Sequence, residues 1–121
     1  MPVITCNEVL EQGAGESILH AIDLTPWLRK PLGWKEGDAA SATISTLTSI
    51  LDSASVLTLA NKAIISSDTV PRHRPDTVIR ASHGVQFRAS GGVAGTRYTI
   101  TAICVDSDSN VWTVVVTLAV V

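Results

Sequence analysis

The sequence has few cysteine and aromatic residues. Of its 121 residues, two are cysteines and only 4% are aromatic. The two cysteines, Cys6 and Cys104, are too far apart in the chain to match a zinc-ligand pair or a Cys-x-x-Cys redox pair. We therefore expect Cys104 to be a buried free thiol inside a strand rather than half of a disulfide.

The sequence also lacks targeting and membrane-spanning signals. Apolar residues nowhere continue over 18 positions, and no basic start followed by an apolar run is present. We expect neither a signal peptide nor a membrane span, and hence a chain made in a reducing cytoplasm. Charged residues make up 17% of the chain and the net charge is −2. Because no overall positive field would attract DNA, RNA or anionic lipid, we expect no specific nucleic acid and no membrane as partners.

Apolar residues, in contrast, are abundant. They make up 45% of the sequence, which argues against a disordered chain. A chain of this length fits one domain, which removes roughly two-thirds of its unfolded surface from water. We expect one core that forms without a metal or a disulfide, and some apolar surface that contacts a partner.

Glycines punctuate the second half of the chain. Apolar and β-branched residues flank the stretch from Gly91 to Gly95, and glycines let the backbone turn where other side chains would clash. We predict a hairpin over residues 85–105, with Gly91, Gly92 and Gly95 as its structural turn. A phosphate-binding loop would instead open a helix and carry Lys-Ser or Lys-Thr after its last glycine, so the glycines predict a turn.

The next two segments alternate with a period of two, which is typical of strands. In Arg97–Val105 and Val111–Val121, one face is apolar and predicts the inner side of a sheet. The opposite face of the last strand is also apolar, and we expect another chain to cover it. We expect the Tyr98 ring to pack in the core with its hydroxyl reaching a backbone group. The predicted structural core includes Tyr98, Ile100, Trp112 and Val114.

The first half of the chain predicts shorter strands with more interruptions. We expect residues 1–16 to form an N-terminal arm that a neighbouring chain can order, and residues 17–121 to form the folded domain. Over Ile50–Ile65 a helix competes with strand, but Ser, Thr and Asn residues disfavour it, and Asn61-Lys62 predicts a turn. The predicted strands are Ser17–Asp23, Ala40–Thr48, Val56–Leu59, Ala63–Ser66, Asp76–Ala81 and Gly84–Ala89.

The overall pattern predicts an all-β protein. Short strands separated by turns, without a convincing helix or a long crossover, are typical of an antiparallel β-sandwich. We predict a single domain with an immunoglobulin-like β-sandwich. Because the Cys-Trp-Cys signature of antibody domains is absent, this prediction concerns the general architecture only.

No group of residues has the pattern of a known catalytic or metal site. Residues 106–110 begin like a calcium loop but lack its central glycine and closing glutamate, so a plain hairpin turn is favoured. His20, His73 and His83 are scattered, and no serine lies in a Gly-x-Ser-x-Gly elbow. We therefore expect no catalytic residue, no cofactor and no bound metal.

The most concentrated basic stretch is Arg72-His73-Arg74. A solvated loop is the simpler interpretation, but arginines can bind the carboxylates of a neighbouring subunit through paired hydrogen bonds. We therefore choose Arg72, His73 and Arg74 as the candidate partner contact. Trp27 and Trp34 flank a loop with proline and glycine, where they are either part of the core or interface anchors.

The order of these features resembles a known family. An opening strand ends in Asp-Leu-Thr-Pro-Trp-Leu at residues 23–28, and Gly37-Asp38 leads into residues 41–44. Residues 90–101 read Ser-Gly-Gly-Val-Ala-Gly-Thr-Arg-Tyr-Thr-Ile-Thr, and an acidic turn and a valine-threonine strand follow. This order is similar to that of the small immunoglobulin-like fibre-tail adaptor proteins of tailed bacteriophages, which carry a Ser-Gly-Gly-Thr-Ala-Gly-x-x-Tyr stretch. The likeness covers residues 18–121, with valine at position 93 where threonine is usual.

The resemblance implies a non-enzymatic structural protein of the virion, present in several copies in the neck, collar or tail. Its implied partners are other phage structural proteins (tail, neck or fibre components) and further copies of itself. An immunoglobulin-like carbohydrate- or surface-binding module is an alternative, although such modules usually expose a strip of aromatic rings that this sequence is too poor in aromatics to supply. A small enzyme subunit is disfavoured because no acid, base and nucleophile set is present.

Overall fold

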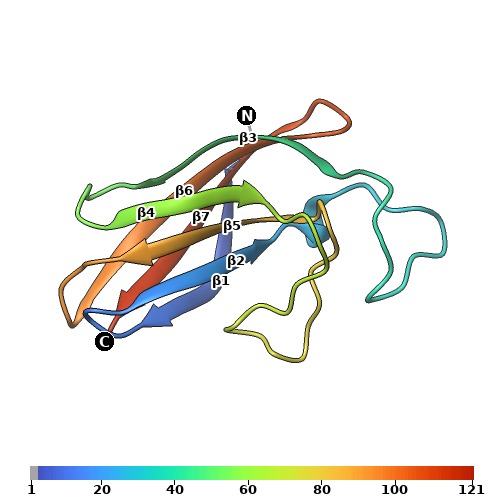
Figure 1. Cartoon of the computed structure of the whole chain (residues 1–121). Coiled ribbons are helices and arrows are strands. Elements are labelled where there is room, and N and C mark those ends of the chain that lie inside the picture. Colours follow the sequence, from blue (N-terminus) through green and yellow to red (C-terminus); the bar gives the residue numbers. More distant parts are fainter. Residues whose placement is uncertain (1–2) are drawn as a thin grey trace.

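The protein is a single-domain β-sandwich, as predicted. The computed structural model describes the backbone of residues 3–121 and the side chains of residues 9–121. Two sheets pack face to face (Figure 1). Sheet A has the strand order β1-β7-β6-β3 and sheet B the order β2-β5-β4. The elements are β1 (Val3–Gln12), β2 (Ser17–Asp23), the 3-10 helix η1 (Thr25–Trp27), β3 (Ile44–Asp52), β4 (Thr58–Ile64), β5 (Gly84–Ser90), β6 (Thr96–Asp106) and β7 (Val111–Val120).

The core lies between the two sheets. Alternating side chains of β6 and β7 point inward, so Tyr98, Ile100 and Val114 are buried. Trp112 is half-buried and packs against the same cluster. Strands β2 and β5–β7 lie within two residues of their predicted bounds.

The glycine-rich stretch is a turn, but the predicted hairpin is wrong. β5 belongs to sheet B and β6 to sheet A, so residues 91–95 cross from one sheet to the other instead of pairing two neighbouring strands. Gly91, Gly92 and Gly95 have φ values of 81°, 89° and 83°. These positive values require glycine in a crossover as much as in a hairpin, which is why the glycines did not distinguish the two.

The segment predicted as an N-terminal arm forms a strand from Val3 to Gln12. β1 pairs in parallel with β7 of the same chain, with Leu10 opposite Leu118, and Leu10 is buried in the core. Residues 13–16 form the turn to β2, and this turn also binds the last residue, because Ala14 N donates to Val121 O at 3.1 Å. The folded domain therefore includes β1, and the prediction of a purely antiparallel sandwich is wrong at this pair.

The turn predicted at Asn61-Lys62 is a bulge inside one continuous strand. The pairing of β4 with β5 shifts register between Ala60 and Ala63, and Asn61 has φ 52°. Asparagine tolerates this left-handed conformation in a bulge as well as in a turn. The two short strands predicted on either side of Asn61-Lys62 are therefore one strand.

Two further strand predictions are displaced or shortened. β3 starts at Ile44, because the N–H groups of Ser41 and Ala42 both donate to Arg29 O and hold the preceding residues in a bend. Residues 76–81 contribute only an isolated bridge between Thr69 and Ile79. Neither segment has a partner strand at these positions in the described part of the chain.

The two ends of the sandwich differ. Two long connections, residues 24–43 between β2 and β3 and residues 65–83 between β4 and β5, project from the same end (Figure 1, right). The opposite end has short connections, among them the glycine-rich crossover. The long connections bring polar residues from distant parts of the chain together.

Candidate functional site

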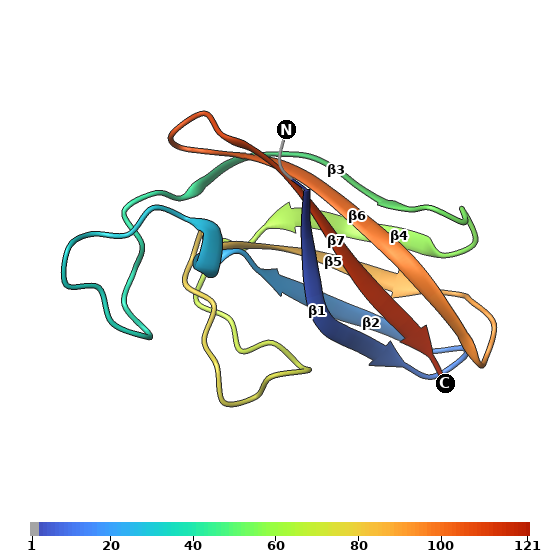
Figure 2. The ribbon, with the colours of Figure 1, turned by 180° about the vertical axis from the view of Figure 1, so that it is seen from behind.

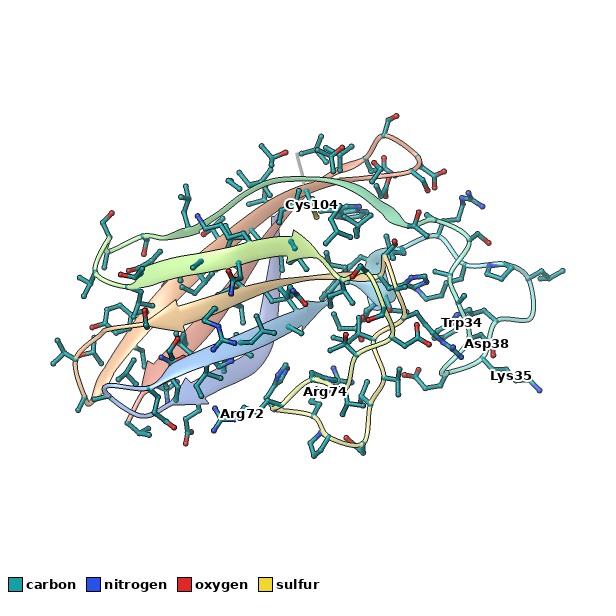
Figure 3. All side chains as sticks on the ribbon, in the orientation of Figure 1. Trp34, Lys35, Asp38, Arg72, Arg74 and Cys104 are labelled. Atoms are coloured by element: carbon teal, nitrogen blue, oxygen red, sulfur yellow. The ribbon has the colours of Figure 1, made fainter. Side chains whose placement is uncertain are left out.

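A groove of about 650 Å³ lies between the two long connections. Its walls come from the end of β2, from residues 34–38 and from residues 68–80. Figure 3 shows Trp34 and Asp38 on the β2–β3 connection that forms one wall. The lining residues are Asp23, Thr25, Trp34, Glu36, Gly37, Asp38, Asp68, Asp76, Thr77, Val78 and Arg80.

The wall that contains Trp34 is a tight turn closed by its own hydrogen bonds. Asp38 accepts from Lys35 N through Oδ2 at 3.1 Å, and its main-chain oxygen accepts from Trp34 Nε1 at 2.8 Å. Gly37 supplies the positive φ of 93° that this turn needs. The Lys30 ammonium group lies 5.2 Å from the centre of the Trp34 ring, within cation–π range. These contacts hold the half-buried ring at the groove.

Arg80 joins the two walls. Its Nε donates to Gly37 O at 2.9 Å, and its Nη1 bonds to Asp68 Oδ2 at 3.0 Å. Asp68 also accepts from Ala81 N at 2.9 Å. The bond from Ala81 N, together with the bond and charge of Arg80, holds the pKa of Asp68 below its ordinary value. One guanidinium group thus fixes the separation of the two connections.

The groove is acidic. Five carboxylate side chains and one guanidinium group line it, and the guanidinium of Arg80 is already paired with Asp68. The arrangement suits contact with lysine or arginine side chains, since opposite charges attract across a partly enclosed surface. Among the described residues, no group of three or more His, Cys, Asp or Glu side chains is arranged to hold a metal ion.

The candidate partner contact predicted from the sequence lies elsewhere. Arg72 Nη1 donates to Glu11 O in β1 at 3.1 Å, and His73 and Arg74 also interact with other residues of the chain. Glu11, His20, Arg72 and His73 line a hollow of about 210 Å³. Figure 3 shows Arg72 and Arg74 on the β4–β5 connection, and neither arginine lines the acidic groove. Arg72 thus helps hold this connection against sheet edges of its own chain.

His20 belongs to a buried hydrogen-bond network. Its Nε2 lies 2.8 Å from Gln12 Oε1, and Gln12 Nε2 donates to Ala89 O at 3.1 Å. Burial, and after it the positive charges of Arg72 and His73, lowers the pKa of His20 to about 4. The ring is neutral at pH 7 and joins β1 to β2. Sequence reasoning missed Gln12, because a glutamine in a predicted arm gives no signal of burial.

The glycine-rich crossover is held in place by Tyr98. The Tyr98 hydroxyl accepts a hydrogen bond from Val93 N at 2.8 Å, which confirms the predicted bond to a backbone group. Gly92 lies against the same ring, because a Cβ built at this position would be 3.2 Å from Tyr98 Cε2 and 2.9 Å from Leu57 Cδ2. At position 92 a side chain would therefore have to displace these neighbours.

Residues 106–110 form a plain hairpin turn between β6 and β7, as predicted. Asp106 Oδ1 accepts from the N–H groups of Asp108 and Asn110, and Oδ2 accepts from Trp112 Nε1 and Asn110 Nδ2. Burial alone would raise the pKa of Asp106, but these bonds outweigh it and hold the pKa below its ordinary value. Both oxygens of the Asp106 carboxylate therefore accept hydrogen bonds from donors of the same chain.

Cys104, Trp27 and Trp34 lie in different surroundings. Cys104 is a buried free thiol, as expected (Figure 3), and burial raises its pKa to about 11. The Cys6 side chain lies outside the described residues. Trp27 packs against the core, whereas Trp34 lines the groove. Trp27 therefore has the core role considered for it, and a role of Trp34 as an interface anchor stays a prediction.

Comparison with known proteins found no matching family model, no similar curated protein and no similar solved structure. In the described part of the chain, no helix has the length and apolar character to cross a membrane.

Proposed function

We propose that this chain is a non-enzymatic structural protein of a tailed-bacteriophage virion, an adaptor in the neck, collar or tail. The proposal follows from the resemblance to the fibre-tail adaptor family. The observation that carries it is the position of the residues that bear this resemblance. Among them, residues 90–101 end β5, form the crossover between the two sheets and begin β6.

These residues are required by the geometry of the crossover. Gly92 packs directly on the Tyr98 ring, and the Tyr98 hydroxyl binds Val93 N. In this chain the glycine and the tyrosine at this spacing pack the crossover against β6. The likeness in this motif therefore supports a likeness in fold, including the immunoglobulin-like topology that we propose for this sandwich.

An adaptor also needs surfaces that bind other proteins, and the end with the long connections offers one. Leu32 is fully exposed in the β2–β3 connection, and Val78 is about half exposed on the wall of the acidic groove. Apolar side chains next to a charged groove are typical of protein-binding surfaces. We propose that a basic segment of a neighbouring virion protein binds at this end.

The proposal is tested on phage particles produced from a genome that encodes this chain. We expect mass spectrometry of purified particles to find the chain in several copies per virion. Particles assembled without it should have filled heads but lack attached tails or fibres in electron micrographs, because the loss of an adaptor does not affect head assembly. Complete, infectious particles without the chain would contradict the proposal.

A carbohydrate- or surface-binding module is the second candidate, and the position of Trp34 favours it. A half-buried indole ring on a groove wall is a suitable platform for a sugar ring. A glycan array probed with the purified chain tests this alternative. Binding that is lost on Trp34→Ala and retained on Trp27→Phe would support it over the adaptor proposal.

A further inference from the structure

Among the side chains that the structure describes (residues 9–121), the central rows of the outer face of sheet A carry no charge. The pairing register places Leu51, Thr101 and Val115 side by side in one row. Val9, Thr117 and Thr99 form the next row toward the crossover. Their side chains point away from the core, because the residues that alternate with them are buried.

Charge appears only at the margin of this face, among the side chains that the structure describes. The last row before the crossover contains Glu11 in β1 and Arg97 in β6, with Ala119 of β7 between them. Glu11 and Arg97 are both exposed. The acidic side chain thus lies on one half of the sheet and the basic side chain on the other.

The outer face of sheet B differs from that of sheet A in both its cover and its charge. The β4–β5 connection folds over its outer face, where Ala21, Ile65 and Ile79 form a small buried cluster. The remaining outer surface of sheet B includes Arg88 and Lys62. The outer side of sheet A has no such cover in Figure 2, and none of the described connections crosses it. Over its described side chains, sheet A is therefore the sheet with an uncovered and centrally uncharged outer face.

We propose that a second copy of this chain covers the outer face of sheet A in a two-fold symmetric dimer. Four strands about 4.8 Å apart and about nine residues long present roughly 600 Å² per copy. The pair would bury roughly 1,200 Å² in total, which is the lower limit for a specific interface. Rows of valine, threonine and leucine suit such face-to-face packing of sheets.

The charged row favours a second copy over an unrelated partner. A two-fold axis that lies in the interface and runs along the strands places β1 of one copy over β3 of the other. This rotation brings Glu11 of each copy within one strand spacing of Arg97 of the other. The face is thus complementary to itself, as a two-fold interface must be.

The inference rests on the proposed role as a multi-copy structural protein, which gives the dimer its setting in the virion. Its test uses the purified full chain in solution. Failure to dimerise and absence from virions are therefore separate results, and either one can occur without the other.

Sedimentation velocity from 1 to about 200 μM is expected to show a monomer–dimer equilibrium. Thr101→Lys places two like charges near the two-fold axis and should raise the dissociation constant at least tenfold. Thr58→Lys makes the same change at an exposed position on β4 of sheet B and should leave dimerisation unchanged. Circular dichroism verifies that both variants retain the strand signal.

Charge exchange tests the orientation and does not depend on Thr101→Lys being folded. Arg97→Glu and Glu11→Arg, each alone, should weaken the dimer by placing like charges near each other. The double variant should restore wild-type association. A wild-type chain that sediments as a monomer throughout the range overturns the proposal. Equal effects of Thr101→Lys and Thr58→Lys on dimerisation also overturn it. So does a double variant that dimerises more weakly than either single variant.

Discussion

The crossover between the sheets can be tested by adding one methyl group to Gly92. Alanine at φ 89° costs roughly 1–2 kcal/mol in backbone strain. Its Cβ would also lie 2.9 Å from Leu57, 3.0 Å from Val120 and 3.2 Å from Tyr98. Tyr98 cannot move without weakening its bond to Val93, so crowding adds about 1–3 kcal/mol. We expect Gly92→Ala to lower the free energy of unfolding by about 2–5 kcal/mol.

Gly95→Ala is the matched control. Gly95 has nearly the same φ, 83°, but a Cβ there would meet nothing within 4 Å. Both variants lose the same unfolded-state entropy of glycine, so the difference between them measures crowding alone. Urea unfolding followed by circular dichroism should show Gly92→Ala less stable than Gly95→Ala by about 1–3 kcal/mol. Equal destabilisation would refute the close packing of the crossover on Tyr98.

Three further predictions concern single side chains. Tyr98→Phe removes the bond to Val93 N and should cost about 0.5–1.5 kcal/mol in urea unfolding, and an unchanged midpoint would contradict that bond. Because the folded-state pKa of Asp106 is lowered, its contribution to stability is present above the unfolded pKa and is lost as the pH falls through the folded value. Asp106→Asn should therefore lose less stability than wild type between pH 5 and 3, and parallel curves would count against this. In a Cys6→Ser background, Cys104 should react with a thiol reagent at pH 8 only after unfolding, since it is buried and its pKa is about 11; rapid labelling of the native chain would disprove its burial.

Local periodicity predicted the strands of the second half well. In β6 and β7 every second side chain is buried in one cluster, and the alternation visible in the sequence reflects that burial. The sequence could not show that Gly91–Gly95 leads to the other sheet. Glycine permits both a hairpin and a crossover, and the choice depends on which strands pair over long distances.

Pairing between distant segments explains the other differences. β1 is defined by its parallel partner β7, which lies about a hundred residues later in the chain, so nothing local marks Val3–Gln12 as a strand. The left-handed conformation of Asn61 is compatible with either a turn or a bulge. It is a bulge because β5 pairs with the chain on both sides of it.

The acidic groove was the least predictable feature. Its residues come from positions 23 to 80, in connections without periodicity, and they meet only because both connections leave the same end of the sandwich. The basic triplet was visible as a charge pattern, but its place beside β1 depended on where the β4–β5 connection turns. A run of charged residues in a sequence identifies a polar loop. It does not show which part of the fold that loop contacts.

The parallel pairing of β1 with β7 has a mechanical consequence. A tensile load applied between the start of β1 and the end of β7 acts along both strands, so it shears their whole ladder at once instead of opening it one rung at a time. Rupture then requires many hydrogen bonds to break together. A domain loaded in this way resists stretching along its strands far better than peeling across them.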